Sequence, residues 1–294
     1  MAAVRPDIEG ADRPGFKDRL MTFYWLYDLP SWLFAAVVIL FFVIIGVGGL
    51  FLTKGWVKRI HHVDHSHNDI VGYFLAALTV FYGITLGLVA VGVWGTFSSV
   101  SDKVDTEAQI VGSLYRDVGT YQEPQRTTLR QDLARYLENV VTVSWPLQQR
   151  GITPSASGRY LNDFQDHLMS VRTDTINGQV LQAEVFHQFN ALVEMRRGRL
   201  NAVNSGMPMP IWALVIIGGL LCVATTWFFH TASFQMHLWM TTMTCCLLGL
   251  IVFMIAILDN PFRGRVSVSS APLELVYQQL VRDPASVRPL SASR

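Results

Sequence analysis

The chain is poor in cysteine and in charge, and both shortages restrict what it can be. Only three of its 294 residues are cysteine, and all three lie inside apolar runs, so a secreted disulfide framework and the usual zinc or thioredoxin spacings are excluded. Charged residues make up 15% of the chain and the net charge is +1, so no basic field is available for nucleic acid. We therefore expect no nucleic-acid partner.

Charge is absent altogether from four apolar runs. Each run is long enough to cross a hydrocarbon core of about 30 Å as a helix. Because none of them contains Asp, Glu, Lys or Arg, the buried acidic relay of a proton-coupled carrier is missing. The lipid bilayer is therefore the expected surroundings of four transmembrane helices, at Ser31–Thr53, Val71–Gly95, Pro210–Phe229 and His237–Leu258.

The chain also shows no alternating strand pattern, so the predicted fold class is all-α. The first 20 residues are polar and rich in proline, and the stretch Phe23–Trp32 is aromatic and suits a membrane surface. After the second run, apolar residues recur at helical spacing, with Pro124 before the first such helix. The predicted units are an interfacial segment, two membrane helices, a cytosolic helical domain, two further membrane helices and a cytosolic tail, at residues 1–30, 31–98, 99–207, 208–258 and 259–294.

Lysine and arginine are unevenly distributed between the two sides of these helices. One side has only Lys54, Lys58 and Arg59, whereas the other carries most of the basic residues near the helix ends. Cytoplasmic loops are the ones enriched in Lys and Arg. The pattern predicts that both termini lie in the cytoplasm, and the expected location is the plasma membrane, which in a bacterium is the inner membrane.

One apolar stripe runs from Asp69 to about Tyr121 in alternating steps of three and four, without a proline. This spacing predicts one continuous helix that begins in lipid and ends in water, with the second run as its membrane half. Small residues dominate the stripe there, and in lipid small residues are used where helices approach closely. The stripe either packs within one bundle or surrounds an axis shared by several copies.

A heptad face outside the bilayer also needs a partner, which favours the second interpretation. The predicted pore-lining residues are Asp69, Gly72, Ala76, Thr79, Gly83, Leu86, Ala90, Val93 and Phe97. Inorganic ions are then the expected cargo. Acidic residues flank the second run at Asp64, Asp69, Asp102 and Asp105, and they would favour cations if they faced the pore.

Imidazole and carboxylate groups are concentrated in the loop before this helix. Such groups are suitable ligands for zinc or copper, and histidines also titrate near neutral pH. The candidate metal ligands are His61, His62, Asp64, His65 and His67. A divalent metal, a pH sensor and a merely solvated loop all fit this composition, and the rest of the chain predicts no cofactor.

Three arginines, Arg196, Arg197 and Arg199, precede the point where the chain re-enters the bilayer. Cationic side chains at this position are typical anchors for anionic lipid headgroups. Attraction of anions at a cytosolic vestibule is the alternative role.

The fourth apolar run ends in a turn sequence. Pro261 disfavours a helical conformation at Asn260, and Gly264 permits a tight turn. The predicted structural turn consists of Asp259, Asn260, Pro261, Arg263 and Gly264. Asp259 is poorly placed for a helix C-terminus, so we expect it to pair with Arg263 or Arg265.

Two motifs carry a resemblance to a known family. His67-Asn68-Asp69 precedes a glycine-rich second span, and Asp259–Gly264 (DNPFRG) is followed by Val266–Ser269 (VSVS). With these motifs the chain resembles the bestrophin-like family over nearly its whole length. The resemblance implies a pentameric, chloride-conducting channel with a pore lined by the second span. Bestrophins carry an acidic calcium-binding run after this turn, whereas Arg263-Gly264-Arg265 stands here, so no calcium site is expected.

An oligomeric ion channel is therefore the predicted function. The alternative is a non-conducting membrane scaffold or accessory subunit that docks a partner through its cytosolic helices. An enzyme is not predicted, because the sequence shows no nucleophile–base pair and no phosphate-binding loop.

Overall fold

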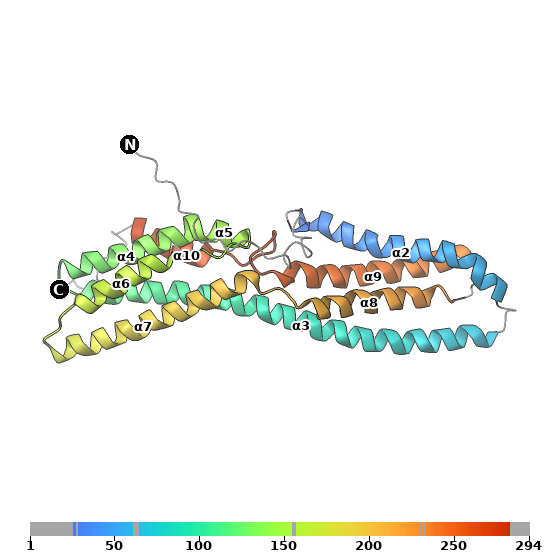
Figure 1. Cartoon of the computed structure of the whole chain (residues 1–294), viewed down its shortest axis with the longest axis horizontal. Coiled ribbons are helices and arrows are strands. Elements are labelled where there is room, and N and C mark those ends of the chain that lie inside the picture. Colours follow the sequence, from blue (N-terminus) through green and yellow to red (C-terminus); the bar gives the residue numbers. More distant parts are fainter. Residues whose placement is uncertain are drawn as a thin grey trace, which may run out of the picture.

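The computed structural model describes residues 26–27, 29–60, 65–154, 157–229, 231 and 233–282, and every regular element within these residues is helical. The molecule is elongated, and helix α3 (His65–Asp117) runs along almost its whole length (Figure 1). Three other long helices lie beside one half of α3: α2 (Ser31–Ile60), α8 (Met209–Thr226) and α9 (Phe234–Asp259). The remaining helices surround its other half.

Among the described residues, four helices are long and apolar enough to span a membrane, namely α2, α3, α8 and α9. The predicted all-α fold with four membrane-spanning helices is thus confirmed. Helices α8 and α9 are joined by a short connection and run antiparallel, and Ser233 caps α9 by accepting a hydrogen bond from the Met236 amide. The predicted division of the chain into five units stays a prediction.

The membrane helices pack closely at glycine residues, where the backbone of one helix lies directly against its neighbour. A Cβ atom at Gly249 of α9 would lie 2.7 Å from the Cα atom of Ile39 in α2, so only glycine allows this contact. At Gly49 of α2, an added Cβ would overlap the indole of Trp227, which donates a hydrogen bond to the carbonyl of Gly46 at 2.9 Å. Glycines in lipid therefore set the distance between these helices.

Helix α3 is continuous for 53 residues, including the region around Phe97 where it leaves its apolar half. A 3₁₀ turn, η2 (Val118–Thr120), follows it. The half-buried Phe97 packs against both hydrophobic cores of the molecule, one among the membrane helices and one beyond them. Helix α3 thus connects the membrane helices to the rest of the molecule without a break.

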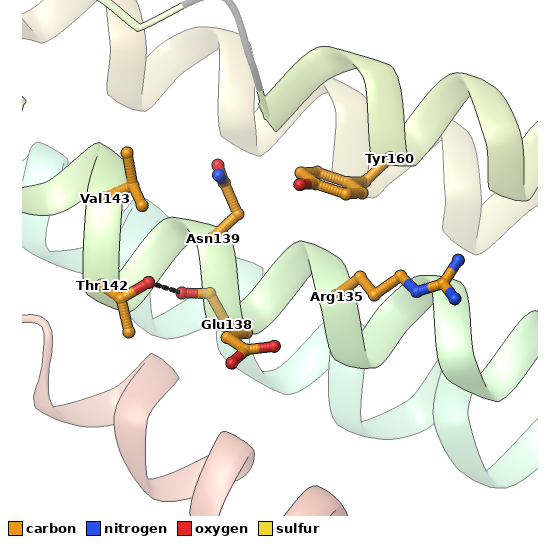
Figure 2. A pocket seen from close by; sticks show the side chains of 6 residues that line it. All are labelled: Arg135, Glu138, Asn139, Thr142, Val143 and Tyr160. Carbon is orange, nitrogen blue, oxygen red and sulfur yellow. Dashed lines mark hydrogen bonds between the residues drawn. The ribbon is translucent and has the colours of Figure 1, made fainter. Parts of the chain in front are cut away.

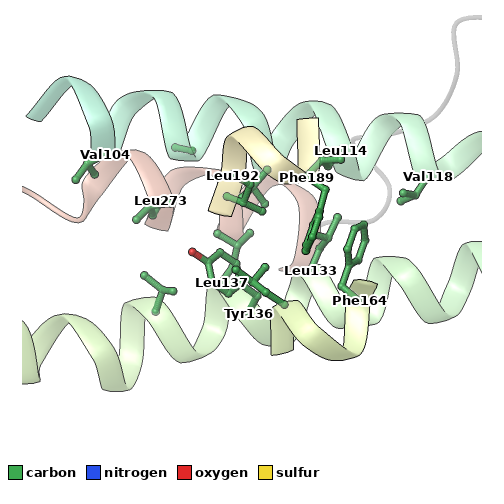
Figure 3. Close-up of a cluster of buried hydrophobic side chains, with 14 of the residues drawn as sticks. Val104, Leu114, Val118, Leu133, Tyr136, Leu137, Phe164, Phe189, Leu192 and Leu273 are labelled. Atoms are coloured by element: carbon green, nitrogen blue, oxygen red, sulfur yellow. The ribbon is translucent and has the colours of Figure 1, made fainter. Parts of the chain in front are cut away.

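We call the second half of α3 with the remaining helices around it the helical extension. Its helices enclose one core, in which Leu114, Leu137 and Phe164 are completely buried (Figure 3). Thr175 caps α7 by accepting a hydrogen bond from the Gly178 amide, and Pro124 immediately precedes α4. The elements of the extension are α4 (Gln125–Asn139), the π-helical η3 (Val140–Ser144), α5 (Trp145–Gln149), α6 (Ser157–Ser170), α7 (Ile176–Asn201), η4 (Ala202–Asn204), α10 (Ala271–Tyr277) and η5 (Gln278–Arg282).

The apolar stripe of α3 finds its partner here within the same chain. Val104, Ala108, Val111 and Val118 are buried in the core of the extension, against residues of α4, α7 and α10. The interpretation of this part of the stripe as a contact between copies is therefore wrong, because the subunit's own helices occupy it.

Candidate functional site

Helix α3 is the least covered of the four membrane helices. Within its most apolar window, 11% of the residues are buried inside the subunit, compared with 50% for α9. Five glycines of α3 have open space where a Cβ would be, with no atom within 4 Å: Gly72, Gly83, Gly87, Gly92 and Gly95. This surface must be covered by lipid or by another protein chain.

The residues predicted to line a pore fall into two groups on this helix. Asp69, Ala76, Thr79 and Gly83 are exposed. Gly72, Ala90 and Phe97 are half-buried, and Ala90 and Phe97 pack against the core of the membrane helices. The Thr79 hydroxyl donates to the Leu75 carbonyl at 2.7 Å, so its polarity is already satisfied inside the helix.

Leu86 and Val93 lie elsewhere, on the face that packs against α8 and α9. Their exposed fractions are 2% and 7%, and both belong to the core of the membrane helices. Tyr82 on the same face donates a hydrogen bond to the Val215 carbonyl of α8 at 2.5 Å. Side chains held in this core cannot at the same time face an axis between copies.

Acidic side chains mark both ends of the uncovered face of α3. Asp69 lies at its membrane end, and Asp102 and Asp105 follow the apolar half. Asp69 and Asp102 are exposed, Asp105 is half-buried, and none of the three makes a salt bridge within the described residues. These carboxylates remain available to solvent or to ions.

The candidate metal cluster lies mostly outside the described residues. His61, His62 and Asp64 are not among them, and His65 and His67 are described only as backbone at the start of α3. The prediction of a divalent metal at this cluster therefore stays a prediction.

The turn after α9 makes contacts with three other segments. Asp259 accepts hydrogen bonds from the Met207 amide, just before α8, at 2.7 Å and from the Trp212 indole, in the first turn of α8, at 3.1 Å. Asn260 donates to the Tyr27 hydroxyl at 3.0 Å, just before α2. Among the described residues, the hydrogen-bond donors to Asp259 are thus neutral groups rather than the expected arginine.

Phe262 connects the same turn to the helical extension. Its ring is 1% exposed and lies edge-on to Trp145 of α5, with 5.5 Å between ring centroids. Gly264 has φ of 80°, a conformation that favours glycine, and Val268 donates to the Pro261 carbonyl to close the turn. The turn therefore joins α8, the start of α2 and the extension at one point.

A buried ion pair adjoins this junction. Arg199 of α7 donates to Glu107 of α3 through Nε at 2.7 Å and Nη2 at 3.0 Å, and through Nη1 to Gln148 at 2.8 Å. Tyr136 donates to the same carboxylate, and Arg199 lies over the Trp145 ring. Arg199 is fully buried, so its expected role as a headgroup anchor is wrong.

The electrostatics of this cluster favour a charged pair. Burial alone would lower the pKa of Arg199, but the charge and hydrogen bonds of Glu107 outweigh burial and leave that pKa raised. Burial and the nearby Glu107 charge raise the pKa of Tyr136 well above its usual range, so the phenol stays a donor. Sequence reasoning missed the pair, although Glu107 stands within the apolar stripe between Val104 and Val111.

A shallow groove of about 470 Å³ lies on the extension between α4, η3 and α6. Figure 2 shows Arg135 and Tyr160 at one end of it and Val143 at the other. The Thr142 hydroxyl donates to the Glu138 backbone carbonyl at 2.6 Å rather than to a base. We assign no chemistry to this groove.

Replacing Asp259 with alanine is expected to lower the free energy of unfolding by about 2 kcal/mol, because it leaves the Met207 amide and the Trp212 indole without an acceptor. The thermal unfolding temperature of the purified protein in detergent would measure this. Asp102→Ala, at an exposed carboxylate, is the control and should change little. Equal stability of Asp259→Ala and wild type would contradict the structural role of the carboxylate.

Comparison with solved structures identifies the same architecture elsewhere. A bacterial bestrophin homologue from Klebsiella pneumoniae, carrying a single substitution, superimposes with a TM-score of 0.64 at 12% identity, over 83% of this chain and 98% of that one. The structure of the bestrophin homologue from the same bacterium that was solved by Zn-SAD phasing superimposes with a TM-score of 0.64 at 12% identity, over 86% of this chain and 99% of that one. No curated protein matches the chain. At this identity the likeness shows the fold alone.

The fold thus defines an all-helical membrane protein with a long helix that continues into a helical extension. The bestrophin-like domain model matches residues 28–273, and the chain belongs to the bestrophin-like family. Both the junction turn and α3 lie within the matched region.

Proposed function

We propose that copies of this chain assemble around an axis with α3 innermost, and that the assembly is an ion channel. The main support is the uncovered surface of α3, where Gly72, Gly83 and Gly87 leave open space on a helix that the subunit itself hardly buries. Within a bilayer, small residues let helix backbones approach closely. Family membership and fold support a channel-type role and give no support to an enzyme.

The side of α3 opposite the subunit core is the proposed pore side. Of the predicted lining residues, Asp69, Ala76, Thr79 and Gly83 are exposed and fit this assignment. Leu86 and Val93 leave the proposed lining, because they pack inside the subunit. In this proposal, the half-buried Gly72, Ala90 and Phe97 lie beside the pore side, where each subunit would meet its neighbour.

Ion selectivity is the second part of the proposal. Repeated around an axis, Asp69 at the membrane end of α3 and Asp102 just beyond its apolar half would form acidic rings, which favour cations. Anion selectivity, by contrast, has support only from the family. We propose that the acidic rings bias the pore toward cations, whatever its overall preference.

Reversal potentials in liposomes under a potassium chloride gradient test this bias. Asp69→Asn and Asp102→Asn are expected to shift the reversal potential toward the chloride equilibrium, because each variant removes one charge per copy. Glu194→Gln, an exposed acid on α7, is the matched control. Unchanged reversal potentials in both aspartate variants would overturn the acidic rings.

Gly83→Leu tests the channel itself. Nothing lies within 4 Å of a Cβ at Gly83, so the subunit should fold, while a leucine on the pore side should reduce the single-channel current severalfold. Gly48→Leu on α2 also enters open space and should leave the current unchanged.

A folded Gly83→Leu variant with wild-type current would count against the proposed pore. A monomer in detergent with no liposome flux would overturn the channel altogether and favour the scaffold. Cytoplasmic termini at a bacterial inner membrane remain part of the proposal, and cysteine labelling from either side would test that orientation.

A further inference from the structure

A second groove, of about 520 Å³, lies between α3 and the end of α7. We call it the boundary groove. Glycines from both helices line it at Gly92, Gly95 and Gly198, and polar side chains line it at Ser99, Lys103 and Asn201. It therefore combines space next to the backbone with a cation and neutral polar groups.

Lys103 is the only charged residue that lines this groove among the described residues. Its aliphatic stem crosses α7 at Gly198, where a Cβ would lie 3.0 Å from the lysine Cδ. Within the described residues, the half-buried Lys103 side chain has no hydrogen bond or ion pair, and neither Ser99 nor Asn201 has a side-chain partner. A partly desolvated ammonium without a partner favours an anion.

The boundary groove crosses from apolar to polar surroundings. Gly92 and Gly95 are exposed in the apolar half of α3, and Lys103 lies about two turns further along. On the opposite wall, Ser205 precedes the start of α8 at Met209 by four residues. Lipid phosphates lie at this boundary, between hydrocarbon and water.

We propose that the boundary groove binds the phosphate of an anionic phospholipid. Lys103 pairs with the phosphate, Ser99 and Asn201 donate hydrogen bonds to it, and an acyl chain lies along Gly92 and Gly95. Inorganic phosphate could make the same contacts with Lys103, Ser99 and Asn201, but it would leave the part of the groove at Gly92 and Gly95 empty. The site does not depend on whether the protein conducts ions.

Lipid retention by the purified full-length protein in detergent tests this site. Native mass spectrometry and thermal unfolding would be recorded with phosphatidylglycerol, phosphatidylcholine and inorganic phosphate. We expect phosphatidylglycerol to bind and to raise the unfolding temperature, and Lys103→Gln to weaken its binding about five- to tenfold. Arg116→Gln, at an exposed arginine of the same helix outside the groove, is the control and should bind as wild type does.

A second variant separates the lipid from a free anion. Gly95→Leu fills open space and leaves Lys103 intact, so it should weaken phosphatidylglycerol binding while the protein still folds. The proposal would be overturned if Lys103→Gln bound phosphatidylglycerol as tightly as the wild-type protein does. It would also be overturned if phosphatidylcholine bound and stabilised the wild-type protein as well as phosphatidylglycerol. An equal response to inorganic phosphate would overturn the lipid as ligand. If a Ser99→Cys variant formed cross-links between copies that the wild-type protein does not form, a second chain would cover the groove. That result would also overturn the lipid proposal.

Discussion

Replacement of Arg199 by methionine is expected to lower the free energy of unfolding by about 3–5 kcal/mol, the largest effect that we predict for a single substitution. The guanidinium satisfies the Glu107 carboxylate and the Gln148 amide in a site with no exposure to solvent. Methionine fills most of the volume but leaves a buried carboxylate with Tyr136 as its remaining donor. Burial of an uncompensated charge, rather than loss of the pair itself, accounts for the size of the effect.

The measurement is thermal unfolding in detergent, together with protease resistance of the extension, where the pair lies. Arg197→Gln is the matched control, since Arg197 is exposed two residues away on the same helix. The double variant Glu107→Leu with Arg199→Met should recover most of the lost stability, because no charge then remains buried. An Arg199→Met protein as stable as Arg197→Gln would contradict this account of the pair.

The second large effect is expected in the membrane half, at Gly249. Leucine at this position should lower the free energy of unfolding by about 3 kcal/mol, since its Cβ meets the backbone of Ile39, which cannot move aside as a side chain can. Separation of α2 from α9 would relieve the overlap only by exposing the packed face of both helices. The purified variant should therefore show a lower unfolding temperature and aggregation in detergent.

Gly48→Leu provides the comparison for this substitution. It introduces the same side chain on α2 into space where no atom lies within 4 Å, so the helix pair should stay intact. If both leucine variants unfolded at the same temperature, lipid exposure of the added side chain rather than the Gly249–Ile39 contact would explain the loss.

The positions of the helices could be predicted from the sequence because the residues that determine them are neighbours in the chain. Uncharged runs predicted the four spans, and the absence of proline with a regular apolar stripe predicted α3 through Phe97. Pro124 marked the start of α4 for the same reason, since its effect on the backbone acts on adjacent residues.

The partners of these helices could not be predicted in the same way. Glu107 and Arg199 are 92 positions apart, so their pairing depends on how α3 and α7 pack. For the same reason the stripe of α3 predicted a buried face but not which chain buries it. The position of Glu107 on the apolar face of α3 was the one sequence signal for this pair, because a buried carboxylate requires a cation nearby.

The candidate site was predicted in part. Small residues on α3 drew attention to this helix, and its exposed Ala76, Thr79 and Gly83 lie where copies could meet. The stripe repeats every 3.5 residues, whereas a straight α-helix has 3.6 residues per turn. A line of residues with this repeat therefore drifts around α3, from the uncovered face to the buried face at Leu86 and Val93. Rotation about the helix axis is therefore the quantity that the pattern left open.

Because α3 is unbroken for 53 residues, it measures about 80 Å and behaves as a stiff lever. A tilt of about 3° around its midpoint would carry each tip sideways by about 2 Å without breaking any backbone hydrogen bond. A displacement of the far end of the extension would therefore also displace the membrane end of α3.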